Sequence, residues 1–405
     1  MDVSRRRMLA GLGVLGAAGL AAGGFAVADS SQGTAAGQIV PFRAAHQGGI
    51  TTAQQDRLLF ATFDVTATDS AEVRDMLRDW TAAAEAMTRG RPVPGRFTPQ
   101  APPPDTGEAD GLLPGNLTIT IGYGPTLFDH RFGLASRRPA ALAALPPLPL
   151  DNLDPAYTGG DIAIQACADD PQVAYHAIRN LARIGTGTVV LRWMETGFGR
   201  TASTSAGQAT PRNLMGFKDG TRNITADQAD LLRDHVWIDA ADQPWARGGS
   251  YLVARRIRMY VNQWDRDFQA DQENVFGRVK STGAPLTGTA EFDTPDFAAR
   301  NGDGTPVIAA DAHIRLAAHE NNNGLRILRR GYSFTDGIDA TGNLLGGLFF
   351  IAFMRDPRQF VTLQTRLGTH DALNEYIQHI GSALFLCPPG LPAGATWAEQ
   401  LFPGP

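Results

Sequence analysis

The order of the strand and helix patterns constrains the fold of this 405-residue chain more than any other feature. In the first half, apolar and β-branched runs alternate with helical patterns in the order β-α-β-β-α-β, which is the ferredoxin-like unit. Ser70 is the expected N-cap of the first helix. The strands are expected at residues 58–67, 116–124, 161–168 and 186–197, and the helices at 70–88 and 170–183.

The second half repeats this order, with a long insertion at residues 280–324 between its first helix and its second strand. An insertion of this length tends to carry function. The sequence therefore predicts an α+β fold of two ferredoxin-like domains with antiparallel sheets, residues 29–210 and 211–405. The second set of strands is expected at 250–264, 325–334, 346–356 and 382–388, and its helices at 265–278 and 356–366.

Residues 1–28 have the pattern of an export signal. Arg5 and Arg6 precede a Gly/Ala/Leu-rich run, and Ala26-Val27-Ala28 is a small-x-small cleavage pattern before Asp29. The paired arginines indicate the twin-arginine type, and the run is too weakly hydrophobic to favour the alternative of a membrane anchor. We therefore expect a secreted or periplasmic protein that is exported folded, with no stable membrane anchor.

Composition excludes several classes of protein. The net charge is −5 and no basic patch carries interleaved aromatic residues, so nucleic acid is not an expected partner. The chain has two cysteines, Cys167 and Cys387, which fit no Cys-x-x-Cys spacing, so covalent attachment of a c-type haem is excluded. A single disulfide and two buried free thiols both remain open.

Three motifs of the second half contain polar residues that are candidates for a functional site. Asp219 lies between two glycines in "GFKDGTRN", a setting that a turn alone does not require. His313 lies in the insertion, in "ADAHIRLAAHE", shortly before the strand "ILRRGYSF" with its paired arginines. No pair among the eight histidines has the His-Glu-x-x-His spacing of a zinc helix. We expect the three motifs to converge on one pocket of the second domain.

Four motifs in this order resemble those of the dye-decolourising peroxidases. "GFKDG" resembles the family's Gly-x-x-Asp-Gly motif, "DAHIR" its proximal haem-ligand segment and "LRRGYS" its distal-arginine strand. "HQGGI" at residues 46–50 resembles an N-terminal signature of the exported, twin-arginine branch. The resemblance covers nearly all of the mature chain. It implies a fold like the dimeric α+β barrel and non-covalent haem b in a pocket of the C-terminal domain.

On the proximal side of the haem, the resemblance implies that His313 is the axial ligand of the iron. Asp371, in "THDALNEY", aligns with the family's carboxylate that bonds the ligand's other ring nitrogen, with Glu375 as the alternative. Arg315 is expected to face a propionate. After "AHIRLA" many relatives continue with Asn-Pro-Arg, whereas this chain has residues 318–320 as Ala-His-Glu.

On the distal side, the resemblance implies that Asp219 and Arg329 are catalytic. Heterolysis of hydrogen peroxide requires a proton to move between its two oxygens and a fixed positive charge near the departing one. Arg330 competes for the role of Arg329, but strand alternation directs it to the opposite face. The residues expected to touch the haem from the distal loop are Gly220, Thr221 and Arg222.

The implied function is a haem peroxidase that uses hydrogen peroxide and an organic reductant, such as a dye, a phenol or another bulky donor. The alternatives are an exported deferrochelatase that releases iron from haem, a low-turnover haem-binding carrier, and a chlorite-degrading enzyme of the related barrel fold. A carrier would need His313 but not the Asp219/Arg329 pair, and chlorite-degrading enzymes lack the Gly-x-x-Asp-Gly loop. The sequence leaves a homo-oligomer open.

Overall fold

The β-α-β-β-α-β order occurs in both halves of the chain, in a computed structural model that describes residues 37–239 and 242–402. The first half contains β1 (Arg57–Val65), α1 (Ser70–Met87), β2 (Thr118–Tyr123), β3 (Ile162–Ala168), α2 (Pro171–Ile184) and β4 (Val189–Arg200). The second half contains α3 (Ala229–His235), β5 (Ser250–Met259), α4 (Val261–Trp264), α5 (Gln269–Phe276), α6 (His313–Ala317), β6 (Leu328–Arg329), β7 (Tyr332–Ile338), β8 (Leu344–Met354), α7 (Arg358–His370), β9 (Ile377–Cys387) and α8 (Trp397–Leu401).

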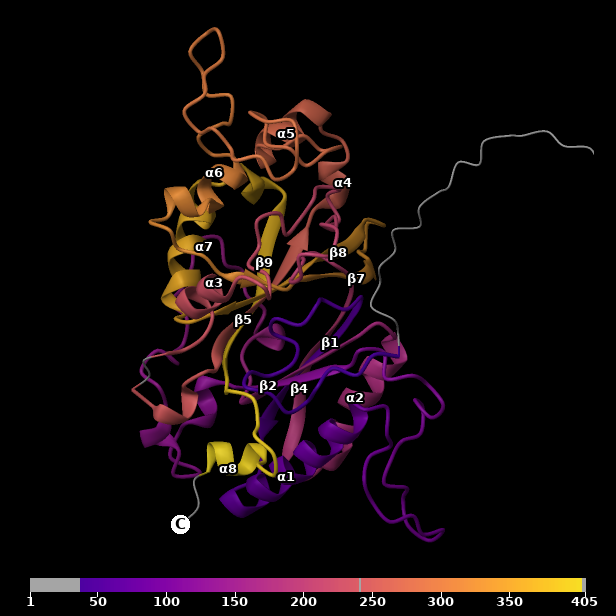
Figure 1. Cartoon of the computed structure of the whole chain (residues 1–405). Helices are drawn as coiled ribbons and strands as arrows, with labels where there is room; N and C mark the ends of the chain where they lie inside the picture. Colours follow the sequence, from indigo (N-terminus) through magenta and orange to yellow (C-terminus); the bar gives the residue numbers. More distant parts are fainter. Residues whose placement is uncertain (1–36, 240–241, 403–405) are drawn as a thin grey trace, which may run out of the picture. The chain divides into compact units, whose positions relative to one another are not determined.

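Eight antiparallel strands close into a barrel that the two halves share (Figure 1). Around the barrel the order is β5, β9, β2, β3, β1, β4, β7 and β8, and β8 pairs back with β5. The short strand β6 also pairs with β8, through Arg329 opposite Ala352. The predicted α+β class and the antiparallel, barrel-like arrangement are confirmed.

Strand alternation sorts the apolar side chains into an interior and an exterior core. On β1, Phe60 points into the barrel, where its ring lies 5.2 Å from that of Phe349 and 6.2 Å from that of Phe385. The neighbouring Leu59 and Ala61 point outward into the core formed with α1 and α2. Because the interior core takes residues from both halves, residues 37–239 and 242–402 belong to one compact unit. The domain boundary near residue 210 stays a prediction.

Several predicted elements differ in detail from the structure. The N-cap of α1 is Asp69 instead of Ser70, because the Asp69 side chain accepts a hydrogen bond from the backbone N–H of Ala71 at 2.8 Å. The strand expected at 250–264 ends at Met259, and α4 follows it. The strand expected at 325–334 is divided at Gly331, whose carbonyl accepts from Thr201 of the first half.

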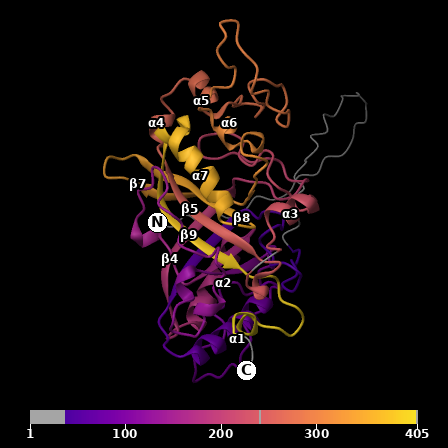
Figure 2. The same ribbon diagram turned by 90° about the vertical axis from the view of Figure 1, so that its left-hand side faces the viewer.

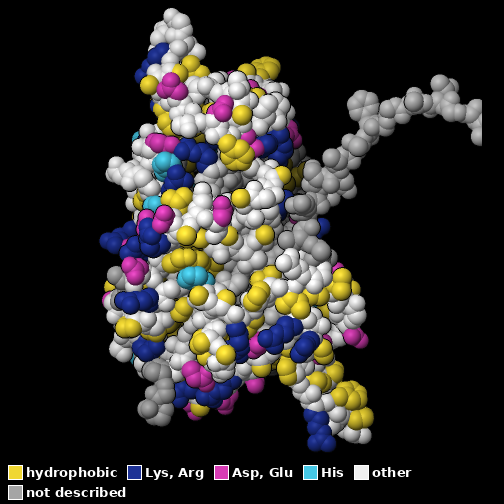
Figure 3. All heavy atoms as spheres, viewed as in Figure 1, with side chains coloured by type: hydrophobic (Ala, Val, Ile, Leu, Met, Phe, Trp, Pro, Cys, Tyr) yellow, Lys and Arg dark blue, Asp and Glu magenta, His cyan; other side chains and the backbone are white. Residues whose placement is uncertain are grey.

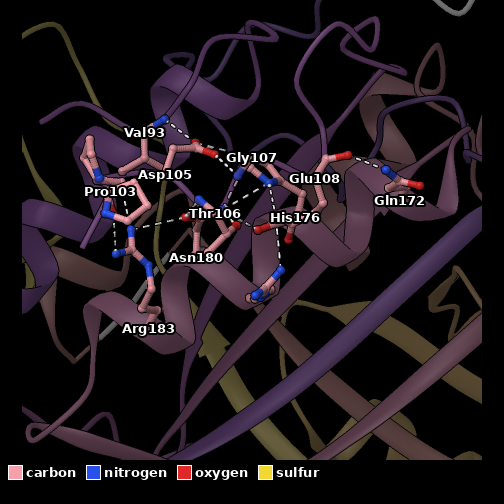
Figure 4. Close-up of polar contacts among 12 residues, drawn as sticks. Val93, Pro103, Asp105, Thr106, Gly107, Glu108, Gln172, His176, Asn180 and Arg183 are labelled. Carbon is pink, nitrogen blue, oxygen red and sulfur yellow. Dashed lines mark hydrogen bonds and ion pairs between the residues drawn. The ribbon is translucent and has the colours of Figure 1, made fainter. Parts of the chain in front are cut away.

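Two long loops stand out from the barrel in Figure 1. The insertion contains α6 and otherwise forms an irregular projection above α5 and α6. The other loop precedes β2 and is fastened to α2 by polar contacts (Figure 4). There, His176 lies 3.4 Å from a carboxylate oxygen of Asp105 and 3.4 Å from one of Glu108, and Asn180 donates to Thr106 at 2.8 Å.

The structure also bears on the cysteines and on membrane association. Cys167 and Cys387 are both buried and free, so the structure has two buried thiols and no disulfide between these cysteines. No helix within residues 37–239 and 242–402 has the length and apolar character needed to cross a membrane. The predicted export signal lies outside the described residues.

Candidate active site

A cavity separates the outer face of the second-half strands from α6 and α7. In Figure 2, α7 lies beside β5 and β9. The volume of this cavity is about 270 Å³. Because strand side chains alternate, Arg255, Ile257 and Met259 of β5 face this cavity while Leu252 and Ala254 face the barrel interior. The walls are mainly apolar, which suits a flat apolar group. Apolar lining residues from the other elements include Leu348, Phe350, Ile377, Leu363 and Leu367.

One wall presents a histidine that a buried carboxylate holds in place. His313 is the first residue of α6, and its Nδ1 lies 2.6 Å from Oδ2 of Asp371, which directly follows α7. The other oxygen of Asp371 accepts from the backbone N–H of Leu373 at 2.9 Å, so the carboxylate is fixed as well. The His313 ring also packs edge-on against Phe276 at 5.9 Å. Since a carboxylate only accepts, Nδ1 carries a proton and the neutral ring has its Nε2 lone pair available for a metal.

The electrostatic setting of His313 follows from the same contact. Burial alone would lower the pKa of His313, but the charge and hydrogen bond of Asp371 outweigh it and raise the pKa above the usual value. The side chain is still 30% exposed, whereas that of Asp371 is only 3% exposed. A basic imidazole that faces a cavity, with its partner carboxylate buried behind it, is the arrangement of a metal-ligating histidine.

The loop around Asp219 supplies the polar groups of the other wall. Asp219 Oδ1 accepts from Arg329 Nη1 at 3.0 Å, and Oδ2 accepts from Asn213 Nδ2 at 3.3 Å. Gly220 has a φ of +98°, and a Cβ there would lie 2.7 Å from Cα of Ala202. Glycine is therefore required because this loop packs against the backbone at residue 202, a reason that differs from the expected close approach to a cofactor.

Arg329 is held on this wall by backbone and side-chain bonds. Asn223 accepts from the backbone N–H of Arg329 and donates to its carbonyl, both at 2.9 Å. The guanidinium also donates to the carbonyl of Thr221 at 3.3 Å. The next residue, Arg330, is fully buried on the opposite face and donates to Thr204 Oγ1 at 3.2 Å. Strand alternation predicted this division between the two arginines.

Of the remaining predicted site residues, three line the cavity and one does not. Gly220, Thr221 and Arg222 all line the cavity, although Thr221 donates to Glu291 at 3.0 Å. Arg315 does not line it, contrary to the expectation that it faces a propionate. Its guanidinium donates to the carbonyls of Phe297 at 2.9 Å and Ala309 at 3.0 Å, so its donors stabilise the insertion. Sequence reasoning missed Asn213 and Asn223, although Asn223 ends the "GFKDGTRN" stretch and its position there could have indicated it.

The cavity therefore brings His313 and Asp371 to one wall and Asp219 and Arg329 to another. The charges of Asp219 and Arg329 both act on His313, in opposite directions. Among residues 37–239 and 242–402, no three His, Cys, Asp or Glu side chains are grouped to bind a metal ion. An ion at His313 would thus take its other ligands from a cofactor. The opposite wall offers a carboxylate to move a proton and a guanidinium to stabilise negative charge.

Comparison with known proteins gives consistent matches over the whole of the fold. The chain matches the families described as Dyp-type peroxidase, N-terminal, over residues 47–199 and Dyp-type peroxidase, C-terminal, over residues 210–391. It is 40% identical over 403 residues to a deferrochelatase of Escherichia coli O6:K15:H31, which covers 96% of this chain and 94% of that protein.

Two solved structures from Streptomyces are similar to this chain. A DyP-type peroxidase from Streptomyces coelicolor superposes with a TM-score of 0.84 at 36% identity, covering 91% of this chain and 98% of that one. Ferric DtpA from Streptomyces lividans has the same TM-score of 0.84 and 36% identity, with 91% and 98% covered.

Proposed function

The chain belongs to the Dyp-type peroxidase family and is a haem-dependent peroxidase, and on this premise we propose that it uses hydrogen peroxide to oxidise dyes, phenols and other bulky one-electron donors. The observation that carries the proposal is the Asp219–Arg329 pair, at 3.0 Å, on a cavity wall apart from the His313–Asp371 pair. Haem b supplies the iron that reacts with hydrogen peroxide. The apolar walls and the available Nε2 of His313 fit such a group.

In this proposal each polar residue has one task. His313 would hold the haem iron through Nε2, while Asp371 holds the ring by its bond to Nδ1 and would increase the basicity of the ligand. Asp219 accepts a proton from one oxygen of hydrogen peroxide and returns it to the other. Arg329 stabilises the negative charge that develops on the departing oxygen, because a guanidinium supplies positive charge and several hydrogen-bond donors.

The rigidity of the distal wall supports these tasks. Arg329 is held by Asn223 through its backbone, and Asp219 is held by Asn213 through its other oxygen. Both acting groups keep about a fifth to a third of their side-chain surface exposed, 18% for Asp219 and 29% for Arg329, so peroxide can reach them. Preorganised groups of this kind need little rearrangement during the reaction.

A single experiment tests the proposed reaction. The haem-loaded chain, mixed with hydrogen peroxide and a phenolic dye, should oxidise the dye over many turnovers in a peroxide-dependent way while its porphyrin keeps the iron. The similarity to a deferrochelatase favours a second candidate, the release of iron from haem. That activity would instead produce fluorescent, metal-free protoporphyrin. A chain that loads haem but does neither would act as a carrier and would contradict both candidates.

We also propose that the chain is exported folded by the twin-arginine route and begins at or near Asp29 once processed. The support is the pattern of residues 1–28, with Arg5 and Arg6 ahead of the apolar run. Replacing both arginines by lysine should retain a haem-loaded precursor inside the cell, which fractionation and mass spectrometry of the N-terminus would measure. Export of the Lys-Lys variant at the normal level would exclude this route.

A further inference from the structure

The mouth of the cavity is lined by a small group of basic residues. Arg222, His319 and Arg326 all line the cavity and are partly exposed, with Glu320 beside them. In Figure 3, histidine and Lys or Arg side chains lie beside one another on the surface over α6 and α7. His319 and Glu320 belong to the segment where the sequence departs from Asn-Pro-Arg, so this part of the group is a feature of this chain.

Arg222 is already bonded within this group. Its guanidinium donates to Nε2 of His319 at 2.9 Å and to Oε1 of Glu320 at 2.5 Å. The Arg222 backbone has a φ of +61°, in the left-handed region that non-glycine residues seldom adopt. Such a conformation persists only where the surrounding structure enforces it, and it is found most often at functional sites. Arg222 thus lines the cavity on a backbone conformation that the surrounding structure holds in place.

Arg326 differs from Arg222 in its contacts. Its carbonyl accepts from Gln359 Nε2 at 2.7 Å, but within residues 37–239 and 242–402 its guanidinium makes no hydrogen bond and no ion pair, although the side chain is half-buried in the cavity wall. Burial and then the charge of Arg222 lower the pKa of Arg326, and Glu320 offsets this only in part. Since the part of the chain that the structure describes uses none of its donors, the Arg326 guanidinium is available to an anionic ligand in the cavity.

The charges at the mouth therefore leave an excess of one positive charge. Arg222 and Arg326 contribute two positive charges, and Glu320 contributes one negative charge. Burial and then the charge of Arg326 lower the pKa of His319, so its ring stays neutral and accepts from Arg222. Glu320 is 34% exposed, and ion pairs at such exposed positions contribute little net free energy. A ligand can consequently displace Glu320 at small cost.

We propose that Arg326 and Arg222 form a carboxylate-binding site at the mouth of the cavity, and that Glu320 occupies Arg222 until the carboxylate of a ligand displaces it. A planar guanidinium with paired donors matches a carboxylate, and two of them can hold both of its oxygens. The carboxylate has two sources, a propionate of bound haem or an anionic organic donor, and in both cases the site rests on the proposed function of the cavity. Glu320 then weakens the binding of either ligand by competing for Arg222.

The first arm of the test measures haem retention instead of activity. Haem transfer from the loaded chain to excess apomyoglobin is followed for wild type, Arg326→Gln and the control Arg300→Gln, which removes an exposed arginine of the insertion. If a propionate occupies the site, Arg326→Gln should transfer haem about tenfold faster, since it loses a charge-assisted bond. Haem dimethyl ester, which lacks the carboxylates, should leave wild type and Arg326→Gln at the same rate.

The second arm compares ferulate with methyl ferulate as electron donors. If a donor carboxylate occupies the site, Arg326→Gln should raise KM for ferulate about tenfold, while KM for methyl ferulate and the rate of haem transfer remain unchanged. In either case Glu320→Gln should act in the opposite direction, with slower haem transfer or a lower KM for ferulate. Misfolding would not strengthen the binding of a ligand, so this result in Glu320→Gln would exclude misfolding as its cause.

The proposal is overturned if Arg326→Gln and Arg300→Gln behave alike in both arms. A failure of the proposed function has a different result, because wild type would then oxidise neither ferulate nor its ester. The haem-transfer arm would still report on the carboxylate site in that case.

Discussion

Replacing His313 by alanine is expected to abolish tight haem binding, so that the purified chain carries little or no pigment. The physical reason is that His313 is the cavity-lining histidine whose second nitrogen is fixed by a buried carboxylate, at 2.6 Å from Asp371. The measurement is the haem content per chain by absorbance, after loading with excess haem and gel filtration. His313→Gly should regain pigment when imidazole is added, because free imidazole can replace the missing ring.

The matched control for this prediction is His370→Ala. His370 is an exposed histidine at the end of α7, directly before Asp371, and its removal should leave the haem content unchanged. Asp371→Asn should retain haem but bind it about 10- to 100-fold more weakly, the usual effect of removing the partner of a ligating histidine. A His313→Ala variant with full haem content and an unchanged spectrum would show that the iron has another ligand.

Removing either member of the distal pair is expected to slow the reaction with hydrogen peroxide while haem stays bound. Arg329→Leu should lower the rate constant about 10²- to 10³-fold, as the loss of a fixed charge does at other sites where negative charge develops. Asp219→Asn should lower it about 10²- to 10⁴-fold by removing the proton carrier. The measurement is stopped-flow absorbance of the haem band over a range of peroxide concentrations.

The structure refines what Asp219→Asn will do. The oxygen of Asn213 accepts from the backbone N–H of Met215 at 3.0 Å, so its amide nitrogen must point toward Asp219. An asparagine at position 219 whose oxygen accepts from Arg329 would turn its NH₂ group toward Nδ2 of Asn213, so that two hydrogen-bond donors would face each other. This variant should therefore also lose about 1 kcal/mol of stability, which thermal unfolding would detect.

Because Asp219 and Arg329 are in contact, their effects should not add. The double variant Asp219→Asn/Arg329→Leu should be slowed by less than the product of the two single effects, as is usual for residues that act as a unit. Fully multiplicative effects would indicate two independent roles. If neither single variant reduces the rate constant by even tenfold, the pair is structural and peroxide activation depends on other groups.

Local patterns predicted most of the fold. The runs that form β1, β3 and α2 were visible as apolar periodicities, because each element buries one regular face. Element ends were less predictable. The N-cap of α1 is Asp69 and not Ser70, since both residues can cap a helix and only the backbone of the preceding turn decides between them.

The candidate site could be predicted where a local rule applied or where a motif resembled a family. Alternation along a strand was enough to separate Arg329 from Arg330, because successive side chains point to opposite faces. The expectation that Arg315 faces a propionate was wrong, because no such local rule fixes the direction of this side chain. Its long side chain lies in an irregular segment, where its direction depends on which carbonyls the folded insertion presents.

The sequence by itself thus determined the order of the elements and the repetition of one α+β pattern in two halves, and its resemblance to a family indicated which residues carry the proposed chemistry. The closure of the two halves into one barrel became visible only in the structure. Only the tertiary structure decided which of those residues meet. His313 and Asp371 are 58 residues apart, and Asp219 and Arg329 are 110 apart. That the Arg326 guanidinium has no hydrogen-bond or ion-pair partner within residues 37–239 and 242–402 likewise became visible only in the folded structure. Side-chain periodicity is local and can be read along the chain, whereas the partner of a charge depends on how distant segments pack.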